Sequence, residues 1–306
     1  MMTKFLFPVV ALCMGLTAVS CSDDNKDNPD EPTGEAVDLP IPSSVVDGVR
    51  VADIQGTLSV DYNADGSINT ATVGGQTYKF EYAESRAAST GRKLARIVAK
   101  QSADGYSNSW QATNFRFNKD GFIVGYLEIN EEILEDSYSE KTTLNVTVDY
   151  NSAGRITSMN ISGTNSGVDE DGKYSYPVKG TIKYQYNGGA LVSSTLQSPQ
   201  ASNTFTFDYA HPHTNTYNIT TPQLAICMAN YSPIAYVFAV TGYMGNASTE
   251  LPTKLTQKYV DFEDADESET ESWDISYTFN DRNAITSITS NIYGTAYTTG
   301  ITYINQ

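Results

Sequence analysis

One sequence pattern recurs along this chain and constrains its fold more than any other feature. Each copy begins with a segment that alternates apolar and polar residues and ends in an aromatic residue. An Asn follows directly, Gly or Asn comes three positions after it, and Ile comes two positions later. Four copies have their anchors at Asn63/Gly66/Ile68, Asn118/Gly121/Ile123, Asn151/Gly154/Ile156 and Asn280/Asn283/Ile285, and a shorter fifth copy lies at Asn187–Gly188–Gly189. Gly and Asn tolerate positive φ, which tight turns between antiparallel strands require. The repeat therefore predicts a series of β-hairpins.

The segments between the turns alternate apolar and polar residues with a period of two. Leu144, Val146 and Val148 alternate with Asn145 and Thr147, for example. One face of each predicted strand is therefore apolar and the other polar. The 21 Tyr residues agree with this interpretation, because Tyr is favoured in strands. We predict an all-β protein, an antiparallel meander of repeated hairpins that closes into a barrel-like sheet.

One segment, 222–244, breaks the β pattern because it is apolar on nearly all sides. Ser232 followed by Pro233 is a typical cap and first-turn pair, as is Thr221 followed by Pro222. We predict a helical insert of two short buried helices that meet at a kink, with Gly245 as the stop. The alternative, a membrane span, is disfavoured by the proline and polar residues at the centre. Cys227 in this segment is expected to be a small buried hydrophobe.

The N-terminus resembles a lipoprotein export signal. A basic residue, a short apolar run and small residues precede Cys21, and the residues from Ala18 to Cys21 resemble a bacterial lipobox. We therefore predict a signal peptide over 1–20, acylation of Cys21, an acidic proline-containing tether over 21–50, and a single domain over 51–306. The alternative is an ordinary signal peptide in which the cysteine occurs by chance.

The order of these motifs resembles a known family. The Tyr-Asn-x-x-Gly-x-Ile hairpins, the apolar insert, and the segments Gly242–Gly245 and Leu251–Lys254 are similar to those of Bacteroidetes lipoproteins catalogued as a domain of unknown function with a porin-like fold. The resemblance covers residues 58–303. It implies a barrel-like antiparallel sheet and no known activity, so it carries no functional residues over. The acidic residues after Cys21 also look like the signal that sends such lipoproteins to the exterior face of the outer membrane.

A porin-like fold does not by itself imply a pore, since a period of two fits either orientation of the barrel wall. The sequence ends Tyr303-Ile304-Asn305-Gln306, without the terminal aromatic residue of outer-membrane barrels, and a lipid anchor would be redundant on an inserted barrel. We expect a barrel whose aromatic face packs inward around 222–244.

Charge and composition exclude several partners and cofactors. A net charge of −17 opposes binding to nucleic acid or to an anionic membrane surface. With two His and three Cys, neither a multi-His zinc site nor a disulfide framework is expected. Asp61, Asn63 and Asp65 match the start of a calcium loop, but Thr72 stands where a bidentate Glu is needed. The hairpin repeat also explains these residues, so we expect no cofactor, with Ca²⁺ as the alternative.

Trp110 is the candidate ligand-binding residue. Counting down the strand from Phe117 and Phe115 places position 110 on the polar face unless a bulge intervenes. An indole on a polar surface is typical of sugar stacking, and the alternative is a strand-end residue folded back onto the core.

No catalytic constellation is present in the sequence, and we expect no enzymatic activity. The main hypothesis is a surface-exposed outer-membrane lipoprotein that binds a glycan, a small molecule or a protein. The first alternative is a structural or assembly component of the cell envelope. The second is a hydrolase, which would need two acids with raised pKa in one pocket.

Overall fold

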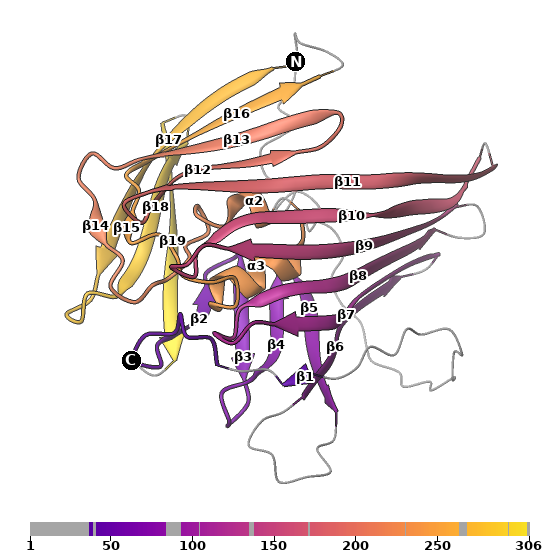
Figure 1. Cartoon of the computed structure of the whole chain (residues 1–306), viewed down its shortest axis with the longest axis horizontal. Coiled ribbons are helices and arrows are strands. Elements are labelled where there is room, and N and C mark those ends of the chain that lie inside the picture. The colour runs from indigo at the N-terminus through magenta and orange to yellow at the C-terminus, as the bar shows by residue number, and fades with distance from the viewer. Residues whose placement is uncertain are drawn as a thin grey trace.

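The computed structural model describes residues 37–38, 41–83, 93–103, 105–134, 138–170, 172–229, 231–262, 268–292 and 294–304 of the chain. Antiparallel strands form a single wall around two short helices (Figure 1). The predicted signal peptide, Cys21 and most of the predicted tether lie outside the described residues. None of the helices in the described ranges has the length and apolar character needed to cross a membrane.

The wall is a closed antiparallel barrel of 16 strands, which confirms the predicted fold class. Its strands, in spatial as well as sequence order, are β2 (Arg50–Ile54), β3 (Leu58–Tyr62), β4 (Ile68–Val73), β5 (Gln76–Ala83), β6 (Lys93–Ala103), β7 (Tyr106–Phe117), β8 (Ile123–Leu134), β9 (Tyr138–Tyr150), β10 (Ile156–Asp169), β11 (Gly172–Asn187), β12 (Ala190–Gln197), β13 (Ala201–Asp208), β16 (Lys254–Asp261), β17 (Glu269–Phe279), β18 (Ile285–Ile292) and β19 (Thr295–Ile304). The barrel closes where β19 pairs with β2. A short strand, β1 (Val37–Asp38), pairs with the start of β6.

The repeated motif forms the predicted hairpin turns. Gly66, Gly121, Gly154 and Asn283 adopt φ values of 81°, 80°, 70° and 63°. In three of the turns the Asn side chain closes the loop: Oδ1 of Asn118, for example, accepts from the backbone N–H of Asp120 and of Phe122, at 3.0 and 2.9 Å. These local bonds hold the turn without any distant contact, which is why the sequence reveals it.

Tyrosine hydroxyl groups at the turn end of the barrel form hydrogen bonds to neighbouring strands. The hydroxyl of Tyr150 on β9 donates to the carbonyl of Ile123, the residue that opens β8 after its turn, at 2.6 Å. The same contact, from a tyrosine at the end of one strand to the first or second residue of the neighbouring strand, recurs at Tyr82–Ile68, Tyr209–Leu191 and Tyr303–Ile285. The aromatic ring packs inward against apolar residues, and the hydroxyl group donates a hydrogen bond to a backbone carbonyl. Both the apolar and the polar part of the side chain therefore have a partner. This role accounts for part of the high tyrosine content.

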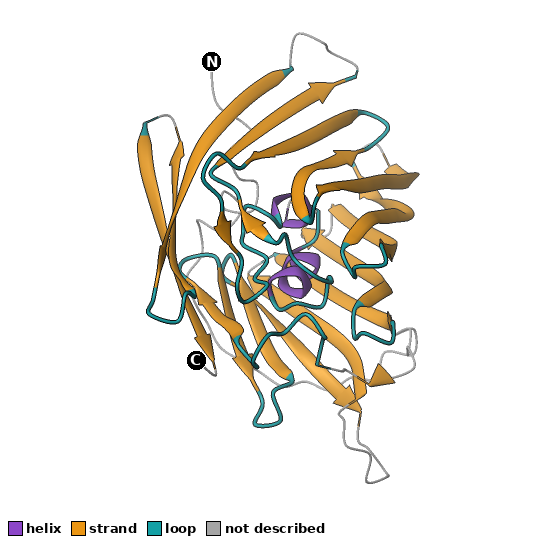
Figure 2. Cartoon of the chain, turned by 60° about the vertical axis from the view of Figure 1, so that its left-hand side comes forward, coloured by secondary structure: helices purple, strands orange, loops and turns teal. Residues whose placement is uncertain are grey.

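The segment between β13 and β16 leaves the wall and fills the barrel. It contains β14 (His213–Thr214), α2 (Ile226–Ala229), α3 (Pro233–Val240) and β15 (Glu250–Leu251), while β13 and β16 pair directly with each other. Figure 2 shows both helices inside the ring of strands. Every residue from Ile234 to Val240 is buried. We call residues 222–244 the plug.

The prediction of two short buried helices in the plug is confirmed, although the ends of the helices differ from those predicted. Ser232 caps α3 as expected, since its Oγ accepts from the backbone N–H of Ala235 at 3.3 Å. The helix α2 begins at Ile226 rather than after Thr221, and α3 ends at Val240, before Gly242 with φ of 90°. The positive φ at Gly242 ends the helix one turn before Gly245. Cys227 is fully buried, as predicted, and burial raises the pKa of its thiol to about 12.

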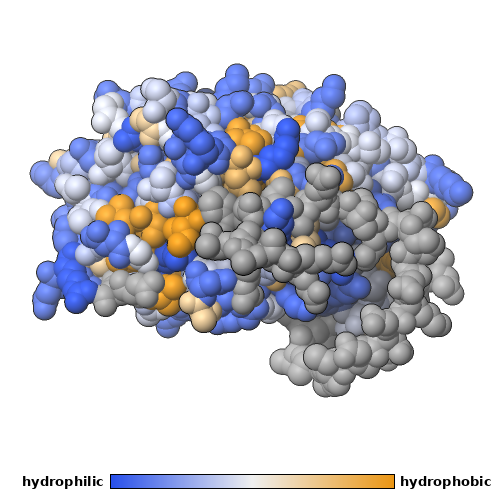
Figure 3. Space-filling model, turned by 60° about the horizontal axis from the view of Figure 1, so that its bottom comes forward, coloured by the Kyte–Doolittle hydropathy of each residue, from blue (hydrophilic) through white to orange (hydrophobic). Residues whose placement is uncertain are grey.

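The outer face of the wall carries many hydroxyl groups. Thr and Ser side chains on neighbouring strands hydrogen-bond across the surface, as at Thr195–Thr204 (3.1 Å) and Thr289–Thr298 (2.8 Å). In the view of Figure 3 hydrophilic residues dominate, and hydrophobic residues form separate patches. A lipid-facing wall would carry a continuous apolar band bounded by aromatic girdles. The apolar face therefore points inward, toward the plug.

Phe238 lies at the centre of the plug and offers a direct test of its contribution. Its ring lies about 6 Å from the rings of Phe80, Phe115, Tyr126 and Tyr243. We expect Phe238→Ala to lower the free energy of unfolding by about 3–5 kcal/mol, because it leaves a cavity that the surrounding rings cannot fill.

Urea unfolding of the purified protein measures this change. The matched control is Thr147→Ala on the exposed face of β9, which should lie within about 0.5 kcal/mol of the wild type. Equal stability of Phe238→Ala and the control would show that the plug contributes little to the fold.

Candidate functional site

The chemistry of the inward face changes along the strands. Next to the plug this face carries apolar residues such as Leu144 and Val146. Further along the same strands the alternation continues, but Thr142 and Glu140 replace the aliphatic side chains. In Figure 1 the ends of β8–β11 project well beyond α2 and α3. The polar part of the inward face therefore lies toward the strand ends that extend beyond the two helices.

Strand register aligns these polar residues in two rows across the wall, which we call the inner polar rows. The first row contains Trp110, Asn130, Thr142, Asn165 and Tyr176, and the second contains Asn108, Glu132, Glu140, Gly167 and Tyr174. Amide, carboxylate and hydroxyl groups lie next to aromatic rings in both rows. This combination can both stack on a ligand and hydrogen-bond to it.

Trp110 lies on the inward face, not on the polar outer face that simple alternation gives. The reason is a bulge between Thr113 and Arg116, with Asn114 at φ of 57°, which reverses the alternation between Phe115 and position 110. The indole is 5% exposed and packs edge-on against Tyr78 with ring centroids 5.1 Å apart. The burial of the ring agrees with the alternative, a residue packed onto the core, and a ligand-binding role for Trp110 stays a prediction.

Trp110 is held by a buried carboxyl group. Its Nε1–H donates to Oε1 of Glu128 at 2.6 Å, and the hydroxyl of Ser232 donates to Oε2 at 2.9 Å. Burial raises the pKa of Glu128 to about 7, and the two hydrogen bonds partly oppose the shift. A hydrolase would need an acid free to reach a substrate, whereas both oxygens of Glu128 are engaged by protein groups.

A tyrosine pair joins the two rows near the free end of the strands, with Tyr176 in the first row and Tyr174 in the second. Tyr174 and Tyr176 stack with ring centroids 6.0 Å apart, and Tyr176 is 51% exposed. Glu140 accepts hydrogen bonds from the hydroxyls of Tyr138 and Tyr174 at 3.1 and 3.2 Å. Gly167 lies beneath this contact, where a Cβ would come within 2.6 Å of the Tyr174 hydroxyl. The glycine lets Tyr174 cross β10 and reach Glu140.

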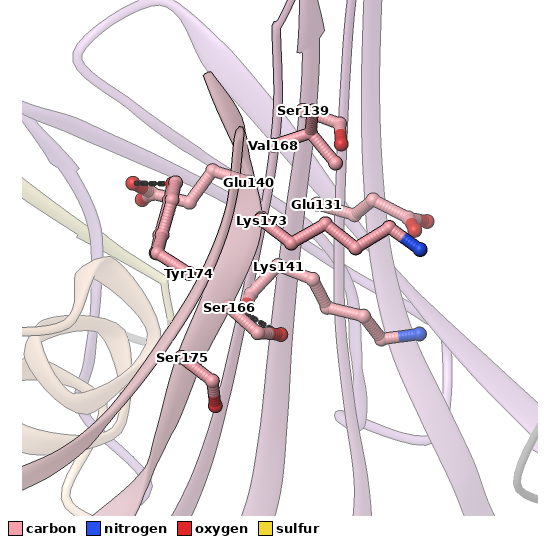
Figure 4. Close-up of a pocket in the computed structure, with 10 residues that line it drawn as sticks. Glu131, Ser139, Glu140, Lys141, Ser166, Val168, Lys173, Tyr174 and Ser175 are labelled. Atoms are coloured by element: carbon pink, nitrogen blue, oxygen red, sulfur yellow. Dashed lines mark hydrogen bonds between the residues drawn. The ribbon is translucent and has the colours of Figure 1, made fainter. Parts of the chain in front are cut away.

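A pocket of about 530 Å³ surrounds these strand ends (Figure 4). Tyr174 and Glu140 lie on one side of the strands, and Lys141, Lys173 and Glu131 extend on the other side. Three residues of the inner polar rows, Glu140, Gly167 and Tyr174, therefore line the pocket together with outward-facing residues of the same strands.

The calcium candidates form an ordinary turn. Asp65 accepts from the backbone N–H and the hydroxyl of Ser67 at 3.0 and 2.7 Å, and Asp61 accepts from Asn69 at 2.7 Å. The amide of Asn63 donates to the same Ser67 hydroxyl at 3.0 Å. These contacts explain all three side chains without a cation. Within the ranges that the structure describes, no group of three or more His, Cys, Asp or Glu is arranged to hold a metal ion.

Sequence reasoning missed Glu128 and most of the inner polar rows. The signal that could have found the rows is the alternation itself, because counting back from Leu144 by twos leads to Thr142, Glu140 and Tyr138. Sequence spacing could not reveal Glu128, since its partners are distant in the chain.

Comparisons with known proteins give structural neighbours only. The fold is similar to that of a porin-like protein from Bacteroides vulgatus ATCC 8482, with a TM-score of 0.47, 13% identity, and coverage of 80% of this chain and 91% of that chain. It is also similar to a porin-like protein from Bacteroides uniformis ATCC 8492, with a TM-score of 0.30, 16% identity, and coverage of 68% and 94%. No protein-family model matches the sequence. No curated protein matches it either.

The bond between Trp110 and Glu128 can be tested through stability. At pH 8, where Glu128 is largely ionised, Trp110→Phe leaves Oε1 buried without a donor. We expect the free energy of unfolding in urea to fall by about 1–3 kcal/mol. The double variant Trp110→Phe/Glu128→Met removes donor and acceptor together and should recover part of this loss. A Trp110→Phe protein as stable as the wild type would contradict the bond.

Proposed function

We propose that this protein is a lipid-anchored barrel of the outer membrane that faces the cell exterior and binds a saccharide through its inner polar rows. The observation that carries the binding function is the change of the inward face from aliphatic residues to Tyr, Asn, Glu and Thr at the point where the plug ends. The stacked tyrosines near the free end of the wall support this function, because the exposed ring of Tyr176 offers an aromatic surface to a ligand. The protein acts by binding and has no enzymatic activity in this proposal.

The chemistry of the rows supports a polyhydroxylated ligand. The stacked pair of Tyr174 and Tyr176 offers an aromatic platform for a sugar ring. Asn165 is 8% exposed, and its Oδ1 has no hydrogen-bond partner among the described residues. A buried acceptor without a partner costs free energy, which a ligand hydroxyl would recover.

The location rests on separate observations. Acylation of Cys21 would hold the acidic tether to the membrane, and the many hydroxyl groups on the outer wall suit a barrel surrounded by water. The barrel would then lie outside the bilayer on its tether.

Saccharide binding is tested on an array of neutral and acidic oligosaccharides. We expect binding by the purified protein, weakened about tenfold by Tyr176→Ala or Tyr174→Ala, because each removes half of the stacked platform. Lys179→Ala is the control, since Lys179 is exposed on the same strand but faces outward. If nothing on the array binds, or if both tyrosine variants bind like the control, the proposal fails.

The anchor is tested by cell fractionation. Replacing Cys21 with Ala removes the acylation site, and we expect the folded protein to move from the membrane fraction to the soluble fraction. Cys227→Ala should leave the protein in the membrane fraction. A Cys21→Ala protein that still requires detergent for extraction would instead indicate an inserted barrel.

A second candidate, an assembly component of the envelope, is favoured by apolar residues at the same strand ends. Ile133, Leu134 and Val168 are 42%, 49% and 38% exposed. Such residues are typical of protein contacts. Recovery of a stable partner from cross-linked membranes would support this candidate, and recovery of the protein alone would count against it.

A further inference from the structure

Glu128 connects the barrel wall to the plug. It lies on β8, accepts from Trp110 on β7 at 2.6 Å, and accepts from Ser232 at 2.9 Å. Ser232 is the N-cap of α3 and also accepts from the backbone N–H of Ala235. One carboxyl group thus joins two wall strands to the first turn of the plug helix.

The same carboxyl group lies at the boundary of the inner polar rows. Trp110 is in register with Asn130, and both belong to the first row. Glu128 precedes Asn130 by two residues and shares its face of β8. A change in the hydrogen bonding of Glu128 therefore acts directly on the indole at the base of the proposed ligand site.

We infer that Glu128 is a proton-sensitive positioning residue, which fixes Trp110 against the plug when ionised and makes saccharide affinity at the inner polar rows depend on pH. The effect on affinity rests on the proposed function. The link between Glu128 and Trp110 does not depend on any ligand.

The groups around Glu128 leave its carboxyl as the one that titrates near neutrality. Trp110 and Ser232 do not ionise in this range. Burial raises the pKa of the Tyr126 and Tyr231 hydroxyls, the nearby titratable groups, and the charge of Glu128 adds to both shifts. The pKa of Glu128 itself is raised to about 7. A change of one pH unit on either side of neutrality therefore changes its charge substantially.

Protonation changes the pattern of donors and acceptors. The carboxylate accepts from Trp110 and Ser232 at the same time, and hydrogen bonds to an ionised acceptor are the stronger kind. The neutral acid becomes a donor at one oxygen, so one of the two bonds must weaken or reorient. The Tyr231 hydroxyl is buried and has no hydrogen-bond partner among the described residues. It is therefore available as a new hydrogen-bond partner when the bonds around protonated Glu128 rearrange.

The link is tested by NMR of the ¹⁵N-labelled protein. The chain has two Trp residues, so two indole N–H signals are expected, and Trp273→Phe identifies the one from Trp110. We expect the Trp110 signal to shift with pH with a midpoint near 7, and the shift to be absent in Glu128→Gln. A Trp110 signal that does not move between about pH 5 and pH 9 would overturn the inference.

Ser232→Ala supplies a second variant in case Glu128→Gln folds poorly. It removes one hydrogen bond that favours the ionised form of Glu128. The midpoint of the Trp110 signal should therefore move to higher pH. A merely structural contact would change the stability of this variant but would not move a titration midpoint, so an unchanged midpoint would also overturn the inference.

The effect on affinity is measured with the oligosaccharide that binds best on the array. We expect its affinity to fall about fivefold or more between pH 8 and pH 6 in the wild type and to stay constant in Glu128→Gln. A titrating Trp110 with constant affinity would overturn the coupling to the ligand site. Absence of saccharide binding at every pH would overturn the proposed function, while the NMR result would still decide the Glu128 link.

Discussion

The plug is the constraint on which the rest of the structure depends. A closed barrel of 16 strands encloses more space than the side chains of its own wall can fill. The segment between β13 and β16 occupies part of that space, and Phe238 alone contacts rings from β5, β7, β8 and the end of the plug. Because the plug buries the apolar face, the outer wall is free to be polar, which is the reverse of a lipid-facing barrel.

The same constraint explains where the candidate site lies. The helices of the plug span only part of the length of the barrel, and the strand ends beyond them carry the inner polar rows. Glu128 lies at the boundary, bonded to the wall on one side and to the cap of α3 on the other. The same carboxyl group therefore takes part in the packing of the plug and borders the candidate ligand site.

Local chemistry made much of the fold predictable from the sequence. The Asn-x-x-Gly turns, the period of two and the Ser232–Pro233 helix start each depend on residues close together in the chain. The face of Trp110 was not predictable, because a bulge at Asn114 reverses the alternation. The inner polar rows and Glu128 depend on where the plug ends along the strands, which is a tertiary property that no local pattern contains.

Native-state hydrogen exchange of the plug tests the central claim most directly. The amide of Tyr236 donates to Ser232, and that of Thr241 donates to Val237, within the filled interior. If the plug is the core of the barrel, these amides should exchange as slowly as those of Val146 and Ile161 in the wall, through global unfolding alone. Exchange of residues 233–241 orders of magnitude faster than that of the wall strands, with the barrel intact, would contradict the account.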